Sequence, residues 1–256
     1  MQVTRVNGSE ATTAEDVLAV EEPLEIRIGE RPVSVTLRTP GEDFDLAAGF
    51  LFTESILQSH ADVASIRHWA SPNVVRVDVN APVDLQRLQR LQRHFYSTSS
   101  CGVCGKVSID ALRVQTSPLN SNVRISPDAV HKLGDALRGQ QRAFDATGAI
   151  HAAGVFDAEG VLLRVREDIG RHNAVDKVIG SYFREGIALD QHLLFVSGRT
   201  SFEILQKAIV ARIPIVAAVG APSSLAVELA QEFNLTLLGF VRDRRFNVYA
   251  GQQRLS

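Results

Sequence analysis

Apolar runs alternate with amphipathic segments in the second half of the chain, and this alternation constrains the fold more than any other feature. The runs at residues 193–196, 213–219 and 235–240 have the length of buried strands. The segments between them carry apolar residues at helical spacing. Because buried strands joined by helices pair in parallel through right-handed crossovers, this half predicts an α/β domain.

Further signals define where the elements of this half begin. Ser126-Pro127 marks a helix start, and a hairpin over residues 148–166 and a helix from about Asn173 follow. Thr200 and Glu203 have the spacing of a capping box, which predicts the start of another helix. Helix 225–233 and a last strand at 246–250 complete the expected order.

The first half has a different rhythm. After a polar start to about Asp16, period-two alternation around residues 29–32 predicts a β-hairpin. Thr39 and Glu42 have capping-box spacing, with Pro40 at the first helical position, so a helix should follow and pack on the hairpin. Two more strands are expected at 63–68 and 74–79, and a helix at 85–95. The chain is therefore predicted to form a mixed β-roll domain at 17–95, a CxxC loop and linker at 96–125, and an α/β domain at 126–256.

Composition limits the classes of function. A chain of 256 residues with 45% hydrophobic content can bury a sizeable core. No apolar run approaches the roughly 20 residues that cross a bilayer, and the first residues lack the plan of a secretory signal, so a cytoplasmic protein without a membrane span is expected. A net charge of −2 disfavours a nucleic-acid partner.

Polar segments follow the predicted strands at 167–173, 197–201, 221–224 and 242–245. Each segment alone is explained by helix caps and solvated loop charges. Four of them at one edge of a sheet favour a phosphate or nucleotide site, although the sequence has neither a Walker pattern nor GxGxxG. Such a site would bring together Arg171, Arg199 and Arg242.

Cys101 and Cys104 are the only cysteines. Their alternative readings are a structural zinc half-site, a regulatory disulfide and incidental thiols. A zinc site needs about four ligands, and no other residues have that spacing, so no metal is predicted. A thioredoxin-like CxxC would directly follow an apolar strand, whereas this one follows the polar segment YSTSS. Thiols among serines and glycines, with Lys106 nearby to favour the thiolate, suit a loop that accepts and passes on sulfur.

Five ordered motifs carry more information together than any one alone: SCGVCGK, EDIGRHNAVDK, SGRTSFEILQKA, APSSLAVELA and GFVRDRRFNVY. From about Val17 onward the chain resembles the FdhD family of formate dehydrogenase accessory sulfurtransferases. The resemblance implies a carrier that takes persulfide sulfur from a cysteine desulfurase. It would deliver that sulfur to the molybdenum bis(molybdopterin guanine dinucleotide) cofactor required by formate dehydrogenase, and GDP or another guanine nucleotide would mimic this bound substrate.

The resemblance also implies residue roles. Cys101 would carry the persulfide, and Cys104 would support or resolve the transfer. Arg171, His172 and Arg199 are added here from their positions at predicted strand ends. The implied contacts to the guanine dinucleotide are Phe240, Val241, Arg242, Asp243, Arg244 and Arg245.

The family's architecture implies a small ubiquitin-like β-roll followed by a three-layer α/β/α domain resembling cytidine deaminase. Deaminase chemistry is not expected, because His151 is followed by Ala152-Ala153 rather than by the HxE pattern. The implied partners are the desulfurase, the formate dehydrogenase apoprotein and a second copy in a homodimer. Two other functions compete: a chaperone that binds the cofactor without transferring sulfur, and a small regulatory zinc protein.

Overall fold

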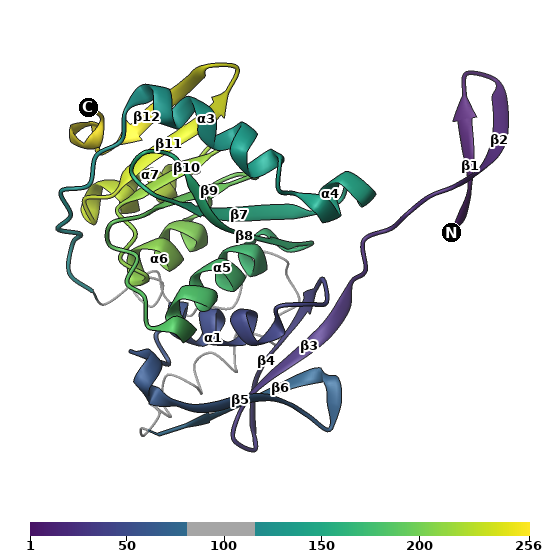
Figure 1. The fold of residues 1–256 in the computed structure, drawn as a ribbon, viewed down its shortest axis with the longest axis horizontal. Helices are drawn as coiled ribbons and strands as arrows, with labels where there is room; N and C mark the ends of the chain where they lie inside the picture. The colour runs from purple at the N-terminus through teal and green to yellow at the C-terminus, as the bar shows by residue number, and fades with distance from the viewer. Residues whose placement is uncertain (81–115) are drawn as a thin grey trace.

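The computed structural model describes residues 1–80 and 116–256 (Figure 1). The predicted helix at 85–95, Cys101 and Cys104 lie outside the described residues. The described part is an α/β protein with sheets of two, four and six strands. Within it, no helix combines the length and apolar content needed to cross a membrane.

The four-stranded sheet has the strand order β4-β3-β6-β5. β3 pairs with β4 antiparallel and with β6 parallel, and one face of the sheet is covered by α1. The predicted β-β-α-β-β order is therefore confirmed. Its elements are β3 (Glu22–Ile28), β4 (Arg31–Arg38), α1 (Asp43–Thr53), the short 3-10 helix η1 (His60–Asp62), β5 (Val63–Trp69) and β6 (Ser71–Val79).

The six-stranded sheet has the order β12-β11-β10-β9-β7-β8. Its centre is parallel, as predicted, because β10 pairs in parallel with both β9 and β11. The outer strands are antiparallel to their neighbours. These strands are β7 (His151–Phe156), β8 (Leu162–Asp168), β9 (Leu193–Val196), β10 (Ile215–Ala218), β11 (Thr236–Arg242) and β12 (Arg245–Ala250).

Helices cover both faces of this sheet, which gives three layers (Figure 1). One face packs against α5, α6 and α7, and the opposite face packs against α3. Ser126 caps α3 by accepting a hydrogen bond from the Ala129 N–H, as its sequence predicts. The helices are α3 (Pro127–Arg138), the unpredicted short α4 (Arg142–Thr147), α5 (Arg171–Glu185), α6 (Phe202–Val210) and α7 (Ser224–Glu232).

The predicted capping box at Thr39 and Glu42 is wrong. Helix α1 begins later, at Asp43, and Glu42 takes a left-handed conformation with no side-chain cap. Asp43 is held by a buried two-point ion pair with Arg38, at 2.8 and 3.0 Å. The Thr39 hydroxyl instead accepts a hydrogen bond from the Ile169 N–H, so a tertiary contact replaces the local cap.

Helices α1 and α5 cross at very close range. A Cβ on Gly49 would overlap the Asp176 carbonyl oxygen, and a Cβ on Gly180 would overlap the Asp45 carbonyl oxygen. Two glycines that face each other allow the two helix backbones to touch. The four-stranded sheet is thereby joined to the six-stranded sheet through its own helix.

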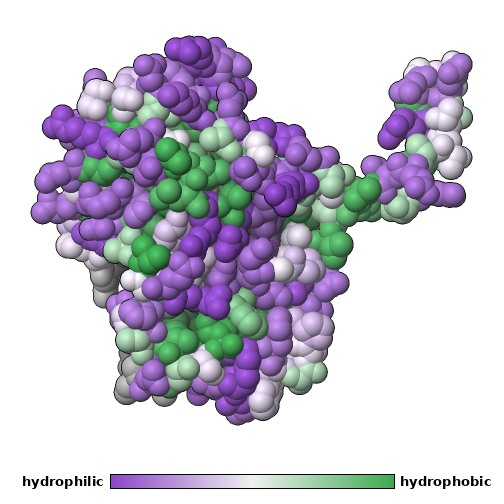
Figure 2. All heavy atoms as spheres, viewed as in Figure 1, coloured by the Kyte–Doolittle hydropathy of each residue, from purple (hydrophilic) through white to green (hydrophobic). Residues whose placement is uncertain are grey.

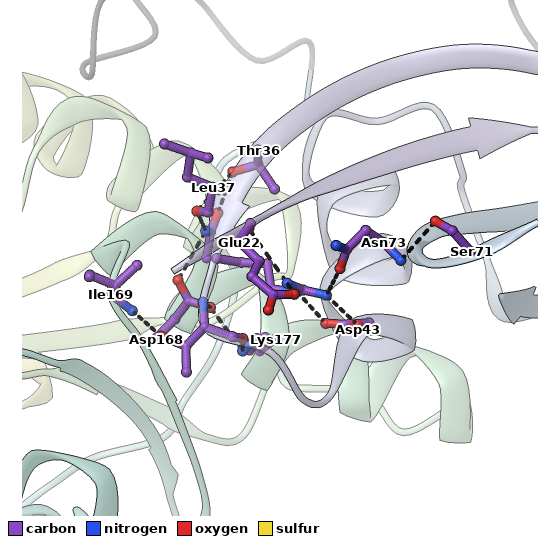
Figure 3. Close-up of polar contacts among 12 residues, drawn as sticks. Glu22, Thr36, Leu37, Asp43, Ser71, Asn73, Asp168, Ile169 and Lys177 are labelled. Carbon is purple, nitrogen blue, oxygen red and sulfur yellow. Dashed lines mark hydrogen bonds and ion pairs between the residues drawn. The ribbon is translucent and has the colours of Figure 1, made fainter. Parts of the chain in front are cut away.

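Buried polar contacts reinforce this junction (Figure 3). Lys177 and Asp168 form a fully buried ion pair of 2.8 Å, and both also bond to the Thr39 backbone. Nearby, Lys207 contacts both Asp176 oxygens at 2.8 and 2.9 Å and the Thr53 hydroxyl at 3.0 Å. Each buried charge is thus paired, which avoids the large cost of an isolated one.

The polar start of the chain forms a hairpin that its composition does not predict. β1 (Gln2–Asn7) and β2 (Glu10–Glu15) pair antiparallel over six residue pairs around a turn at Gly8. Figure 1 shows this hairpin projecting away from both larger sheets.

The helix crossing makes a stability prediction. Gly180→Ala should lower the free energy of unfolding by about 1–3 kcal/mol or more, because its Cβ meets backbone that has no room to move. Gly134→Ala is the matched control, since a Cβ there has ordinary contacts at 3.8 and 3.9 Å in helix α3. It should raise the free energy of unfolding by roughly 0.5–1 kcal/mol. Urea denaturation measures both values, and equal effects would contradict the close crossing.

Candidate functional site

Three helices begin at one edge of the six-stranded sheet. Helix α5 follows β8, α6 follows β9 and α7 follows β10, with Gly170, Ser201 and Ser223 at their N-caps. The unpaired N–H groups and the dipole of a helix N-terminus attract anions. This edge encloses a cavity of about 370 Å³ that is lined by Arg171, Arg199, Thr200, Ser201, Ala221, Pro222 and Ser223.

The loops that form this cavity are bonded to one another. Thr200 and Pro222 form a parallel β-bridge, and the Ser223 N–H donates to the Thr200 carbonyl at 3.0 Å. The Gly220 N–H donates to the Gly198 carbonyl at 3.1 Å. A Cβ on Gly220 would come within 2.9 Å of that carbonyl oxygen, so the close approach requires glycine. The walls of the cavity are therefore positioned before any ligand arrives.

Two buried polar atoms at this cavity have no hydrogen-bond partner within the part of the chain that the structure describes. They are Nε of Arg171 and Oγ1 of Thr200. Burying an unsatisfied polar group costs about 1–3 kcal/mol, and more when the group is charged. An anion at the cavity would offset that cost. This pair of atoms is the clearest sign of a ligand site in the described residues.

The structure brings Arg171 and Arg199 together, as predicted, but Arg242 does not line the same cavity. His172 does not line the cavity either, although its Nε2 is 3.3 Å from the hydroxyl of the lining residue Ser201 and 2.9 Å from Glu203. Glu203 therefore orients His172, and the predicted capping box of Thr200 with Glu203 is wrong. Helix α6 starts one residue later, after Ser201.

His151 was not predicted to belong here. It is the first residue of β7, and a Cβ on Gly198 would lie 3.4 Å from its Nδ1. Burial lowers the pKa of His151, and the nearby Arg171 and His172 lower it further against the opposing charge of Asp168. Only the antiparallel pairing of β7 with β9 brings it to this edge, and no local sequence signal reveals that pairing.

Residues 240–245 lie at the end of β11 and in the turn to β12. Val241 is buried in the core, whereas the four residues from Arg242 to Arg245 are exposed. The Phe240 N–H donates to the Gly220 carbonyl at 3.2 Å, which ties the segment to the loop beside the cavity. Left-handed backbone occurs at Phe240, Asp243 and Arg244.

Left-handed backbone is unusual for a bulky residue such as Phe240. Strained residues of this kind persist where surrounding structure holds them, and they cluster at ligand clamps. The charged side chains nearby form only long, exposed ion pairs among the described residues. Arg244 is 3.8 Å from Asp128, Arg245 is 4.0 Å from Asp243, and all four side chains are strongly exposed. They are available to a ligand beside the cavity.

A second cavity of about 370 Å³ lies at the other end of α5. Its lining includes His60, Phe183, Gly186 and Arg212. The described chain stops and resumes beside it, since the Asn80 N–H donates to the Asp62 carbonyl and Arg212 donates to the Ser117 carbonyl. Helix α5 has 15 residues, so the two cavities are about 22 Å apart along it.

Comparison with known proteins identifies the family of this chain. The model of the FdhD/NarQ family matches residues 19–256. The chain belongs to the FdhD/NarQ family. Its relatives include proteins named sulfur carrier protein FdhD from Streptomyces avermitilis (46% identical, covering 100% of this chain and 94% of that protein) and Nocardia farcinica (47%, covering 99% and 93%). A third, from Mycobacterium tuberculosis, is 43% identical and covers 100% and 97%.

The fold of this FdhD/NarQ member has also been seen before. The crystal structure of a formate dehydrogenase accessory protein from Desulfotalea psychrophila superposes with a TM-score of 0.82 over 100% of this chain and 98% of that one. The two sequences are 21% identical, so the match shows a shared fold.

The cavity makes a binding prediction. Arg171→Gln should weaken the binding of GDP, the diphosphate probe, by roughly 10- to 100-fold, because a charge-assisted hydrogen bond contributes about 1.5–3 kcal/mol. Arg164→Gln is the matched control, since Arg164 pairs with Glu185 elsewhere on the surface. Isothermal titration calorimetry gives both dissociation constants. A loss of the same size in both variants would place the diphosphate elsewhere.

Proposed function

We propose that this chain accepts persulfide sulfur from a cysteine desulfurase on Cys101 and delivers it to the molybdenum bis(molybdopterin guanine dinucleotide) cofactor destined for formate dehydrogenase. Its general role is that of a sulfur carrier, because it belongs to the FdhD/NarQ family and its full-length relatives are named sulfur carriers. The donor, the acceptor and the chemistry of transfer are the proposed steps.

The cavity at the three helix N-termini supports the choice of acceptor. Its unpaired Arg171 Nε and Thr200 Oγ1 would bind a phosphate group of the guanine dinucleotide. Arg199 adds a second positive charge to the same lining. The guanine end would then lie against the neighbouring segment 240–245. This segment is held beside the cavity by the hydrogen bond from the Phe240 N–H to the Gly220 carbonyl. His172, held by Glu203, would stand beside the phosphates.

Sulfur pickup would use thiolate chemistry. The Cys101 thiolate attacks the outer sulfur of the desulfurase persulfide, the sulfur–sulfur bond of the donor breaks, and the donor cysteine leaves as a thiolate. In the delivery step, Cys104 attacks Sγ of Cys101 and releases the outer sulfur as sulfide. The disulfide that remains would be reopened by a cellular thiol. On this scheme the protein is a sulfurtransferase.

On this proposal, the chain around Cys101 would have to reach the phosphate site from the far end of α5. The chain leaves and re-enters the described part beside the second cavity, about 22 Å along α5 from the proposed phosphate site. Cys101 is 15 residues before Thr116, and an extended chain spans about 3.3 Å per residue. The chain length therefore permits Cys101 to reach either end of α5.

The four-stranded and six-stranded sheets would be ubiquitin-like and cytidine-deaminase-like, in domains at residues 17–95 and 126–256 with the CxxC linker at 96–125. The protein would act in the cytoplasm, as a homodimer, and would contact the formate dehydrogenase apoprotein. A chaperone that only binds the cofactor would share the cavity but would not need Cys101.

Intact-mass spectrometry after incubation with a cysteine desulfurase and free cysteine tests the proposal. Wild-type and Cys104→Ala protein should gain the mass of one sulfur atom, and a reductant should remove it. Cys101→Ala should gain none, because it lacks the accepting thiolate. If no protein gains sulfur, the binding-only chaperone is the better account; sulfur that persists on Cys101→Ala would assign the carrier role to Cys104.

A further inference from the structure

Arg171, which carries the proposed phosphate contact, has no polar partner to orient it. Among the described residues its side chain makes no hydrogen bond or ion pair, and its Nε is buried without a partner. The direction of such a side chain depends on the backbone that carries it and on the residues that support that backbone. The placement of the loop before Arg171 therefore decides whether the cavity can receive a phosphate.

This loop is held by Thr39, which directly follows β4 of the four-stranded sheet. Thr39 has three polar groups, and each is bonded to the segment 168–177. Its N–H donates to Asp168 at 3.1 Å, its hydroxyl accepts from the Ile169 N–H at 3.1 Å, and its carbonyl accepts from Lys177 at 2.9 Å. The end of β4 is thus bonded directly to the loop and to the first turns of α5, as Figure 3 shows.

The bond to Ile169 is the one nearest to the cavity. Only Gly170 separates Ile169 from Arg171. The Gly170 N–H donates to Asp168 at 2.8 Å, and a Cβ at this position would come within 2.9 Å of the Asn173 side chain. A displacement of Ile169 would therefore pass to Arg171 through a single, tightly packed residue.

Thr39 is itself fixed on both sides. The buried Arg38 before it forms the two-point ion pair with Asp43 after it, and this pair closes the turn that contains Thr39. Arg38 also donates to the Asn73 side chain of β6 at 3.0 Å. Figure 2 shows the parts that hold the two larger sheets packed against each other as one body. The four-stranded sheet therefore offers the loop a fixed support.

We propose that Thr39 is a positioning residue of the phosphate site: its hydroxyl holds the Ile169 backbone and thereby orients Arg171 into the cavity. No described residue of the four-stranded sheet lines that cavity, so Thr39 acts through the loop and touches no ligand. Groups that are held in place before binding lose less conformational entropy when the ligand arrives. The inference rests on the proposed function, because it takes the cavity to be the phosphate site.

Thr39→Val tests this role, because valine has a similar shape but cannot accept a hydrogen bond from the Ile169 N–H. The dissociation constant for GDP, measured by isothermal titration calorimetry on the full chain, should rise about three- to tenfold, the factor that corresponds to one hydrogen bond. Thr39→Ser keeps the accepting oxygen, so its dissociation constant should stay within about twofold of the wild-type value. An unchanged dissociation constant in Thr39→Val overturns the inference.

Thr53→Val is the matched control. The Thr53 hydroxyl also joins α1 to α5, by donating to Asp176 at 2.8 Å, but this contact is not part of the loop before Arg171. Both valine variants should lower the urea concentration at the midpoint of unfolding, whereas only Thr39→Val should weaken GDP binding. An equal loss of affinity in both would assign the effect to general destabilisation and would contradict a positioning role.

The double variant Thr39→Val, Arg171→Gln shows whether Thr39 acts through Arg171. Once the guanidinium is absent, Thr39→Val should change the GDP dissociation constant by less than about twofold, because coupled residues are not additive. An undiminished effect in that background would overturn the inference. Failure of the phosphate site gives a different result: wild-type protein would not bind GDP, or Arg171→Gln alone would not weaken binding, and both proposals would then be wrong.

Discussion

The contact between α1 and α5 joins the two larger sheets and holds the helix whose two ends lie at the two cavities. Gly49 and Gly180 permit the helix backbones to touch, and the buried charges of Lys177 and Lys207 are neutralised by carboxylates beside that contact. Because α5 is fixed along its length, its first residue, Arg171, is fixed at one cavity and its last turn at the other. Through α1, the four-stranded sheet therefore helps to hold Arg171 in position at the proposed cofactor site.

That site combines rigid backbone with unsatisfied polar atoms. The loops after β9 and β10 are bonded to each other, so little conformational entropy remains to be lost there when an anion binds. The buried Nε of Arg171 and hydroxyl of Thr200 lack partners among the described residues, which costs stability in the free protein. The site therefore lowers the stability of the free protein but has its contacts to an anion already in place. The strained left-handed backbone of Phe240 nearby lowers stability in the same way.

Much of the architecture was predictable because it depends on local periodicity. The strand at residues 193–196, the Ser126 cap and the β-β-α-β-β order all follow from apolar spacing and from turn residues. Both capping boxes failed, since Thr39 bonds to Ile169 and Glu203 bonds to His172 rather than to their own helix ends. Contacts between residues more than a hundred positions apart, as between Thr39 and Ile169, cannot be read from local spacing.

The sequence by itself determined the family and the two thiols of the CxxC motif, because motifs and composition are properties of the chain alone. It also placed Arg171 and Arg199 after strands, and these two strands, β8 and β9, end at the same edge because each is antiparallel to β7 between them. Only the tertiary structure kept Arg242 out of the lining of that cavity and brought His151 beside Gly198. These outcomes depend on strand order and helix crossing, which arise from packing between distant segments.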